Sequence, residues 1–337
     1  MTTGHLASIP ISDIEGFGIG HWTDLEGPTG TTAIVAPAGA VGGVDVRGGA
    51  PASRETDLLR PENTVDVVHA VVLSGGSAFG LEAASGVARE LEAQGIGLDV
   101  GCAKVPIVCS SCLFDLALGD PTIRPGIDAG IAAAREALEA ARRGGPVAEG
   151  NVGAGAGATV GKLLGPDHAM KGGLGAKALS LGPVKVGAIS AVNACGNVID
   201  PASSRPIAGM RASAEAMRIV DMEEAALAAA SSMRMPLDRT NTTISCIITN
   251  VALTKAQACK VAQMASDAYA HTIRPTHTTN DGDTVYVLSS NALEDAHKVP
   301  LDLLGLIATR ALEAAICSGC TTAQGIGGIP SYKDLID

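Results

Sequence analysis

The chain has 337 residues, 46% of them hydrophobic, which is enough to bury the core of one compact body, and we expect residues 1–337 to form a single domain. Its net charge of −11 argues against a nucleic-acid partner, because nucleic-acid binding depends on clustered Lys and Arg side chains. No apolar stretch reaches the roughly 20 residues of a membrane span, and the first residues lack the features of a signal peptide, so we expect a cytoplasmic protein.

In the N-terminal half of the chain, Val-rich runs predict strands, and Ala and Leu at helical spacing predict helices. The Pro and Gly residues at 37 and 39 separate the first two strands, so we expect these strands to form a hairpin. In chain order, the predicted elements are strands at Thr31–Val35, Val41–Val46 and Val67–Leu73, and helices at Leu81–Gln94 and Ile127–Arg143.

The C-terminal half also alternates between strands and helices. Residues 231–241 are polar and contain a Pro, so they predict an exposed loop. Ser213 is the expected N-cap of the first helix. The predicted elements are strands at Val184–Val192, Thr242–Thr249 and Thr284–Ser289, and helices at Ser213–Ser231, Lys255–His271 and Leu301–Ile316. This order is typical of layered sheets with helices outside.

A glycine-rich segment at 150–162 is similar in composition to a phosphate-binding loop, but its spacing is different. Ala156 stands where the first Gly of that motif belongs, and Leu163 follows Lys162 where Ser or Thr should bind magnesium. We therefore expect these glycines to serve close packing or an active-site loop, and we expect no cofactor.

Two Cys-x-x-Cys pairs, Cys109 with Cys112 and Cys317 with Cys320, leave two interpretations open. Together they could bind a zinc ion or act as redox pairs in a non-catalytic protein. They could also be buried thiols that act as small hydrophobic side chains, which we favour because neither pair lies in a recognisable zinc-binding knuckle. We therefore expect no metal site.

Thr242 stands where the polar segment meets the strand, directly after Asn241. If its hydroxyl attacked the Asn241 carbonyl, an N-to-O acyl shift and hydrolysis would release an α-amine beside that hydroxyl. An α-amine titrates near pH 8, so it could act as the base and no catalytic His would be needed. Locally, the same residues could also be only a turn before a strand.

Asp281 and Asp283 lie in the segment NDGD, just before the strand that starts at Thr284. Asp-Gly is a common centre of a tight turn. Alternatively, two carboxylates at this spacing could be held beside a nucleophile and tune proton transfer.

Seven stretches spread over nearly the whole chain carry a resemblance to a known family. They are EGPTGTTAIVAPAGAVGGVDVRGG (26–49), LSGGSAFGLEAASGV (73–87), GAGAGATVGK (153–162), KGGLGAKAL (171–179), NTTISCIITNVALTKAQ (241–257), RPTHTTNDGDTVYVLSS (274–290) and GGIPSYKDL (327–335). In combination they closely resemble the L-aminopeptidase/D-esterase family of N-terminal-nucleophile enzymes. That family includes β-peptidyl aminopeptidases and the endo-type 6-aminohexanoate-oligomer (nylon oligomer) hydrolase.

The resemblance implies an α/β fold, a four-layer αββα sandwich shared with ornithine acetyltransferase. It also implies cleavage after Asn241 into chains 1–241 and 242–337, with Thr242 as the nucleophile. Many family members instead have Ser as nucleophile and a Ser/Glu pair, so this chain resembles the nylon-oligomer branch more closely.

The resemblance also implies roles for other side chains. Asn193 would donate an N–H to the oxyanion, and Lys162 would lie beside the nucleophile. Asp281 and Asp283 match the acidic pair of the family. Phe114 occupies the position where many members place a Tyr near the oxyanion, so a phenolic hydroxyl is missing in the substrate pocket.

The sequence thus favours a self-processing amide hydrolase or aminopeptidase that acts on a small peptide or amide. An acyltransferase resembling ornithine acetyltransferase is the second hypothesis, and the non-catalytic metal or thiol protein is the third. Since homo-oligomers are common in the family resembled, we expect a homo-oligomer.

Overall fold

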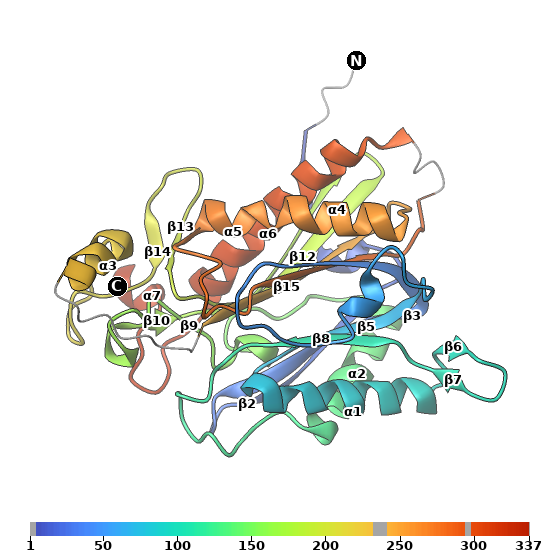
Figure 1. Cartoon of the computed structure of the whole chain (residues 1–337), viewed down its shortest axis with the longest axis horizontal. Coiled ribbons are helices and arrows are strands. Elements are labelled where there is room, and N and C mark those ends of the chain that lie inside the picture. Colours follow the sequence, from blue (N-terminus) through green and yellow to red (C-terminus); the bar gives the residue numbers. More distant parts are fainter. Residues whose placement is uncertain (1–4, 232–240, 294–297, 337) are drawn as a thin grey trace.

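A computed structural model of the chain describes residues 5–231, 241–293 and 298–336. Its main strands form one continuous ladder that is divided into two facing sheets, with helices on both outer faces (Figure 1). In order of pairing, the first sheet contains β1 (Ala7–Ile9), β11 (Gly173–Leu181), β12 (Val184–Asn193), β15 (Thr242–Thr249), β17 (Thr284–Ser289) and the C-terminal half of β3 (Thr29–Val46). The second contains β2 (Gly18–Asp24), the N-terminal half of β3, β5 (Val68–Ser74), β8 (Val108–Cys112) and β4 (Ala52–Arg54).

The predicted hairpin at the start of the chain is wrong, because both of its strands belong to the single 18-residue strand β3. Thr31–Val35 pairs with β2 and β5, whereas Val41–Val46 pairs with β17. Between these segments the register shifts, and Gly39 adopts a positive φ of 83°. The Pro and Gly residues therefore produce an irregularity rather than a reversal, and β3 continues from one sheet into the other.

The described part of the chain also contains seven α-helices and three small additional sheets. The helices are α1 (Glu82–Ala93), α2 (Ile127–Arg143), α3 (Met222–Ser231), α4 (Lys255–Ala265), α5 (Asp267–Thr272), α6 (Leu301–Thr322) and α7 (Lys333–Ile336). The additional strands are β6 (Leu98–Asp99), β7 (Lys104–Val105), β9 (Thr159–Val160), β10 (Met170–Lys171), β13 (Asn197–Ile199), β14 (Pro206–Ala208) and β16 (Ile273–Arg274).

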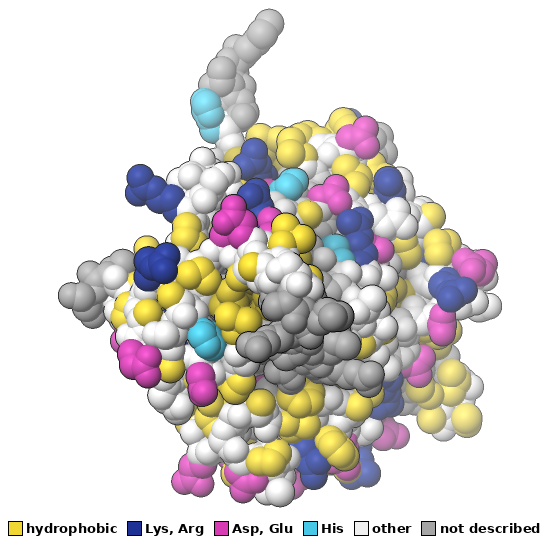
Figure 2. Space-filling view, turned by 60° about the vertical axis from the view of Figure 1, so that its left-hand side comes forward, with side chains coloured by type: hydrophobic (Ala, Val, Ile, Leu, Met, Phe, Trp, Pro, Cys, Tyr) yellow, Lys and Arg dark blue, Asp and Glu magenta, His cyan; other side chains and the backbone are white. Residues whose placement is uncertain are grey.

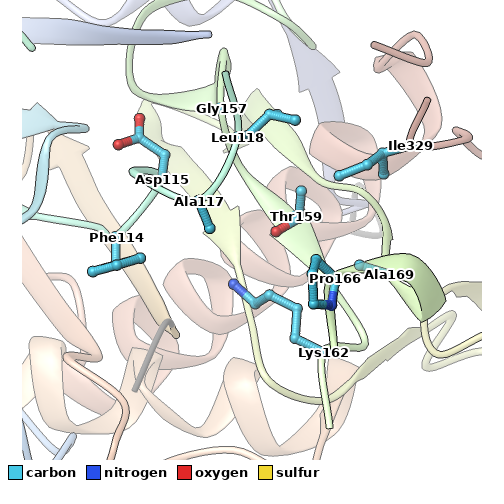
Figure 3. Close-up of a pocket in the computed structure, with 10 residues that line it drawn as sticks. All are labelled: Phe114, Asp115, Ala117, Leu118, Gly157, Thr159, Lys162, Pro166, Ala169 and Ile329. Carbon is cyan, nitrogen blue, oxygen red and sulfur yellow. The ribbon is translucent and has the colours of Figure 1, made fainter. Parts of the chain in front are cut away.

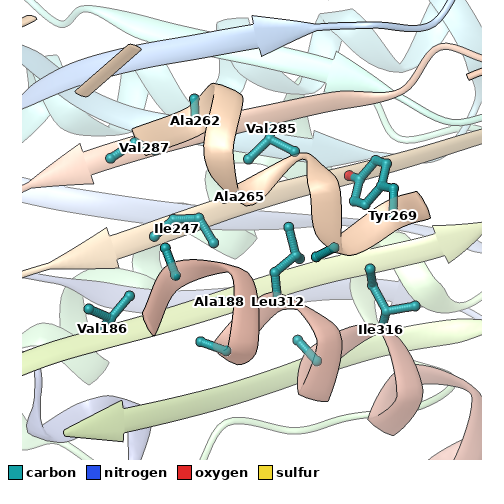
Figure 4. Close-up of a cluster of buried hydrophobic side chains, with 14 of the residues drawn as sticks. Val186, Ala188, Ile247, Ala262, Ala265, Tyr269, Val285, Val287, Leu312 and Ile316 are labelled. Carbon is teal, nitrogen blue, oxygen red and sulfur yellow. The ribbon is translucent and has the colours of Figure 1, made fainter. Parts of the chain in front are cut away.

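Three clusters of buried side chains separate four layers. Ile34 and Ile244 belong to the cluster between the two sheets. On β15, Ile247 points to the other side, into the cluster beneath α4, α5 and α6 (Figure 4). Val72 belongs to the third cluster, beneath α1 and α2. Because side chains alternate along each strand, both sheets are apolar on both faces. The layers are helices, sheet, sheet and helices, as the family resemblance implied.

Glycines bring these layers into direct contact, in a chain of which only 2% is aromatic. A Cβ added to Gly175 of β11 would lie 1.9 Å from the carbonyl oxygen of Ala315 in α6. On the opposite side of the sandwich, a Cβ on Gly18 of β2 would lie 1.9 Å from the carbonyl oxygen of Ala137 in α2. The backbones of helix and strand therefore touch where a larger residue would separate them.

The helix expected at Ser213–Ser231 is shorter than predicted and begins at Met222. The Ser213 hydroxyl accepts a hydrogen bond from the Ala216 N–H, but this bond closes a local turn instead of capping a helix. The carboxylate of Asp221 accepts from the Glu224 N–H instead, at the true start of the helix.

The remaining helices and strands agree closely with the predictions, apart from their ends. The helix expected at Lys255–His271 is divided into α4 and α5, and the last long helix extends to Thr322. This helix, α6, is long and apolar enough by composition to cross a membrane, yet 72% of its most apolar window is buried inside the protein. Charged side chains of both signs are dispersed over the face shown in Figure 2.

Replacing Gly175 with Ala should destabilise the protein by about 1–3 kcal/mol, because the new methyl group would force α6 away from β11. Thermal and urea unfolding would measure this loss. Gly126→Ala is the matched control, since its Cβ would approach only the flexible end of Glu82, at 3.1 Å. Equal unfolding midpoints for the two variants would contradict the close-packing argument.

Candidate active site

Thr242 and Asn193 face each other at one end of the first sheet. Thr242 is the first residue of β15, Asn193 is the last residue of β12, and the antiparallel register pairs them directly. Both are buried, as is Asn241. The Thr242 hydroxyl hydrogen-bonds to the carbonyl oxygen of Asn241. The hydroxyl therefore lies against the peptide group that precedes it. Residues 232–240 of the expected exposed loop lie outside the described residues.

Three of the described residues hold the Asn193 side chain in its orientation. Its Nδ2 donates to the carbonyl oxygen of Phe114 at 2.9 Å. Its Oδ1 accepts from the Thr159 N–H at 3.0 Å and from Nζ of Lys162 at 2.8 Å. A carbonyl can only accept and an ammonium can only donate, so the amide cannot be flipped. At most one Nδ2 hydrogen remains for another acceptor. Phe114 contributes its backbone carbonyl to this contact.

Lys162 is a buried cation, with only 6% of its surface exposed. Its Nζ also donates to the backbone carbonyl oxygen of Asn193 at 3.1 Å. Burying an ammonium is costly unless it is hydrogen-bonded and compensated by a negative charge. Burial and the charge of Asp283 raise the pKa of Asp281, and the positive charge of Lys162 offsets a small part of that rise. Lys162 therefore hydrogen-bonds to Asn193 and also interacts through its charge with Asp281.

Asp283 is held by four hydrogen bonds and is almost completely buried, with 3% exposure. Oδ1 accepts from the backbone N–H of Thr243 at 2.8 Å. Oδ2 accepts from the Thr276 hydroxyl at 3.0 Å, and from the backbone N–H and ring Nδ1 of His277 at 3.1 and 2.9 Å. Asp283 thus fixes the backbone immediately after Thr242.

Asp281 has a different environment, although only one residue separates it from Asp283. One oxygen, Oδ2, accepts from the Thr278 N–H at 2.6 Å. Burial, followed by the nearby charge of Asp283, raises the pKa of Asp281 to about 6. The two carboxylates therefore differ in role. Asp283 holds the backbone in place through its hydrogen bonds, and Asp281 is the one whose pKa is raised towards neutral pH.

Gly282, between the two carboxylates, packs directly against the candidate nucleophile. A Cβ at this position would lie 2.8 Å from Oγ1 and 3.1 Å from Cγ2 of Thr242. The Asp-Gly-Asp segment is therefore more than a surface turn, because its glycine leaves the space that the threonine side chain occupies.

His277 supports the site, although the sequence analysis did not single it out. His277 has a positive φ of 55°, and the centroid of its ring lies 5.5 Å from that of Tyr269, with the two rings tilted by 31°. The Tyr269 hydroxyl in turn donates to the carbonyl oxygen of Thr243 at 3.1 Å. Only its position six residues before Asp283 could have indicated this supporting role.

The glycine-rich segment 150–162 packs closely around a second buried lysine, Lys171. Nζ of Lys171 donates to the carbonyl oxygens of Gly155, Ala158 and Gly172 at 2.9, 2.7 and 3.0 Å. Burial lowers the pKa of this lysine to about 7. These carbonyls are occupied by a lysine of the same chain, which supports the packing interpretation of the glycines.

The two Cys-x-x-Cys pairs lie in different layers. Cys109 and Cys112 are on β8 in the second sheet, whereas Cys317 and Cys320 are on α6, over the outer face of the first. They cannot share one zinc ion. Burial raises the pKa of Cys109 and Cys320 to about 12, which disfavours the thiolates that redox chemistry needs.

The structure thus brings together every site residue expected from the sequence. A hydroxyl on a strand end lies opposite an oriented amide that a buried ammonium holds, and the segment that carries the two carboxylates packs against it. This combination suits attack of the hydroxyl on a carbonyl carbon with stabilisation of the resulting oxyanion.

Comparison with known proteins gives a consistent result. Residues 10–333 match peptidase family S58. The chain is 39% identical over 345 aligned residues to an uncharacterized aminopeptidase of Mycobacterium leprae, with 96% of this chain and 92% of the relative covered. It is 32% identical to a 6-aminohexanoate-oligomer endohydrolase of Agromyces sp., with 84% and 75% covered.

Solved structures show the same fold at lower sequence identity. A β-aminopeptidase of Burkholderia sp. superposes with a TM-score of 0.68 at 20% identity, covering 98% of this chain and 94% of that one. The L-aminopeptidase D-Ala-esterase/amidase of Ochrobactrum anthropi, described as a variant of the Ntn-hydrolase fold, gives 0.66 at 21% identity, with 98% and 91% covered.

Replacing Asp281 with Asn should stabilise the protein more at pH 8 than at pH 5. The folded-state pKa of about 6 lies above the ordinary value of 3.8, so the unfolded chain releases the Asp281 proton at a lower pH than the folded chain does. Folding stability is therefore lost as the pH rises from about 4 to about 6, and Asn avoids this loss. Chemical unfolding of both proteins should show the difference in unfolding free energy growing by about 1–2 kcal/mol between these pH values. A difference independent of pH would contradict the raised pKa.

Proposed function

Since the chain belongs to peptidase family S58 and is a hydrolase of amide or peptide bonds, we propose that Thr242 is its nucleophile and that the chain cleaves itself after Asn241. The observation that carries this proposal is the contact between the Thr242 hydroxyl and the carbonyl group of Asn241. No other described threonine combines such a contact with a register partner like Asn193 and an adjoining acidic pair.

In the self-cleavage, Oγ1 of Thr242 attacks the carbonyl carbon of Asn241 as its proton passes to a base. The C–N bond then breaks, the nitrogen takes up a proton, and an ester joins Asn241 to Thr242. Water hydrolyses this ester, leaving a carboxylate on Asn241 and a free α-amine on Thr242. We assign the proton transfer to Asp281, because it adjoins Gly282, which packs against Oγ1 of Thr242, and because its pKa of about 6 leaves it mostly ionised at neutral pH.

In substrate hydrolysis, the new α-amine accepts the hydroxyl proton of Thr242, and the oxygen attacks the amide carbonyl of a small peptide or amide. Nδ2 of Asn193 donates to the oxyanion, a kind of contact that is worth about 3 kcal/mol in comparable sites. Lys162 holds the Asn193 amide in position and adds positive charge. The amine leaves with a proton, and water then hydrolyses the acyl-threonine.

Asp283 is a positioning residue in this scheme. Its Oδ1 holds the N–H of Thr243, so the peptide after the nucleophile cannot move when the peptide before it breaks. His277 and Thr276 hold its other oxygen from the opposite side. After cleavage, Thr242 with its free amine would therefore stay in place opposite Asn193.

Intact-mass spectrometry of the wild type should show two polypeptides, 1–241 and 242–337, whereas Thr242→Ala should remain one chain of 33.7 kDa. Loss of the hydroxyl should also lower amide hydrolysis by at least about a thousandfold. Thr242→Ser retains the hydroxyl and should still be cleaved. An uncleaved wild type that hydrolyses amides would sink the proposal.

Gly282→Ala should slow both self-cleavage and turnover by about a hundredfold, because its methyl group would displace the Thr242 side chain by a fraction of an ångström or more. The rate of fragment formation and kcat would be measured by gel densitometry and an amide assay. Thr279→Ala, an exposed substitution in the same loop, is the control and should react normally. Normal rates for Gly282→Ala would show that this glycine does not determine the nucleophile's position.

A further inference from the structure

We infer that Lys171 is a positioning residue of the active site, because its ammonium holds the peptide group that orients the Asn193 side chain. The inference rests on the proposed function, since it concerns the residue that donates to the oxyanion. It predicts that this buried lysine affects the rate of amide hydrolysis through the backbone, although it lies on a different strand from Thr242.

The peptide group between Ala158 and Thr159 has a hydrogen-bond partner at each end. Its N–H, from Thr159, donates to Oδ1 of Asn193 at 3.0 Å. Its carbonyl oxygen, from Ala158, accepts from Nζ of Lys171 at 2.7 Å and from the Gly172 N–H at 2.9 Å. A peptide group is planar, so fixing its carbonyl oxygen restricts the direction of its N–H. Lys171 and Asn193 are therefore linked through one rigid unit.

The ammonium of Lys171 uses its donors on backbone carbonyl oxygens. Besides Ala158, it donates to Gly155 at 2.9 Å and to Gly172 at 3.0 Å. An ammonium has three N–H donors and no acceptor, so these three carbonyls satisfy it. The side chain is completely buried. An apolar side chain of similar length would leave the Ala158–Thr159 peptide without this contact.

The backbone of Lys171 is itself held in place. Strand β10 pairs with β9 in a register that places Lys171 opposite Thr159. The N–H of Lys171 donates to the carbonyl oxygen of Pro330, in the segment before α7, at 2.7 Å. Because its main chain is fixed, the lysine anchors the glycine-rich segment instead of moving with it.

Asp115 secures the other backbone segment that contacts Asn193. Nδ2 of Asn193 donates to the carbonyl oxygen of Phe114 at 2.9 Å. The next residue, Asp115, is 4% exposed. Its two oxygens accept from the Gly76 N–H and the Thr29 hydroxyl, each at 2.7 Å. These bonds tie the segment that carries the Phe114 carbonyl to β3 and to the turn after β5.

Lys171 and Asp115 also attract each other by charge. Burial raises the pKa of Asp115, and its hydrogen bonds together with the charge of Lys171 offset part of that rise. Phe114 and Thr159, which contact Asn193 from the two segments, line one cavity (Figure 3). Buried groups of opposite charge thus stabilise both segments that hold Asn193.

The test starts with Lys171→Met, which removes the ammonium and keeps a side chain of similar length. For each cleaved chain, kcat for amide hydrolysis should fall about tenfold, because a displaced Asn193 would donate poorly to the oxyanion. KM should change by less than about twofold, since the oxyanion forms only as the reaction proceeds. Mass spectrometry would give the cleaved fraction, and an amide assay the kinetic constants. An unchanged kcat would overturn the inference.

Lys255→Met is the matched control, because Lys255 is also a buried lysine that donates to backbone carbonyl oxygens. It is the first residue of α4 and 6% exposed, and its Nζ donates to Leu58 and Asn63 at 3.1 and 2.7 Å. Its substitution should lower the thermal unfolding midpoint and leave kcat within about twofold of the wild-type value. An equal loss of kcat in both variants would overturn the inference, because it would show a general effect of losing a buried lysine.

Asn193→Ala tests whether the effect passes through Asn193. In that background the oxyanion donor is already absent, so Lys171→Met should lower kcat by less than about twofold. A further fall of about tenfold would overturn the inference, because Lys171 would then act on another group.

Hydrogen exchange tests the link without turnover. In the Thr242→Ala chain, Lys171→Met should speed exchange of the Thr159 amide hydrogen, measured by NMR, at least about tenfold more than Lys255→Met does. Equal exchange in the two would overturn the inference. If Lys171→Met fails to fold, Lys171→Gln replaces it in every comparison, since a shorter side chain with two N–H donors cannot hold three carbonyls, and the same outcomes apply.

Turnover separates this inference from the proposed function. Thr242-dependent turnover that Lys171→Met leaves unchanged would overturn the role of Lys171 and leave the nucleophile in place. Turnover that survives Thr242→Ala, together with faster exchange of the Thr159 amide in Lys171→Met, would overturn the proposed function and support the link from Lys171 to Asn193.

Discussion

The pairing of β12 with β15 is the constraint on which the rest of the site depends. It places Asn193 opposite Thr242, so the amide and the hydroxyl share one end of the sheet. The partners of Asn193 come from the loop after β8 and from the glycine-rich segment, which are distant in the sequence. A register slip of one residue would turn the Asn193 side chain to the other face and separate these groups.

The three buried charged residues near Thr242 and Asn193 have different roles. Asp283 accepts four hydrogen bonds and therefore fixes the backbone. Asp281 accepts a hydrogen bond from Thr278, and its proton affinity is raised by burial and by the charge of Asp283. Lys162 offsets part of that negative charge while it orients Asn193. In the same buried surroundings, Asp283 thus holds the backbone, Asp281 can titrate near neutral pH, and Asn193 is an oriented hydrogen-bond donor.

Small residues make this arrangement possible. Helix α6 rests directly on Gly175, and the nucleophile rests against Gly282, so both the layers and the site are built by contact with backbone. The solved relatives keep the fold at 20 and 21% identity. The layered arrangement is therefore compatible with sequences in which most aligned residues differ.

The sequence by itself determined the elements whose periodicity is local. The helix at Ile127–Arg143 and the strands at Thr242–Thr249 and Thr284–Ser289 have the predicted bounds, because helical spacing and β-branched runs are properties of short segments. The family motifs likewise identified the residues that meet at the site. Only the tertiary structure decided that β3 is one strand across two sheets, since its Pro and Gly residues are compatible with a turn or a bulge. It also decided that His277 supports Asp283. These outcomes depend on partners that are far away in the chain, which no local pattern encodes.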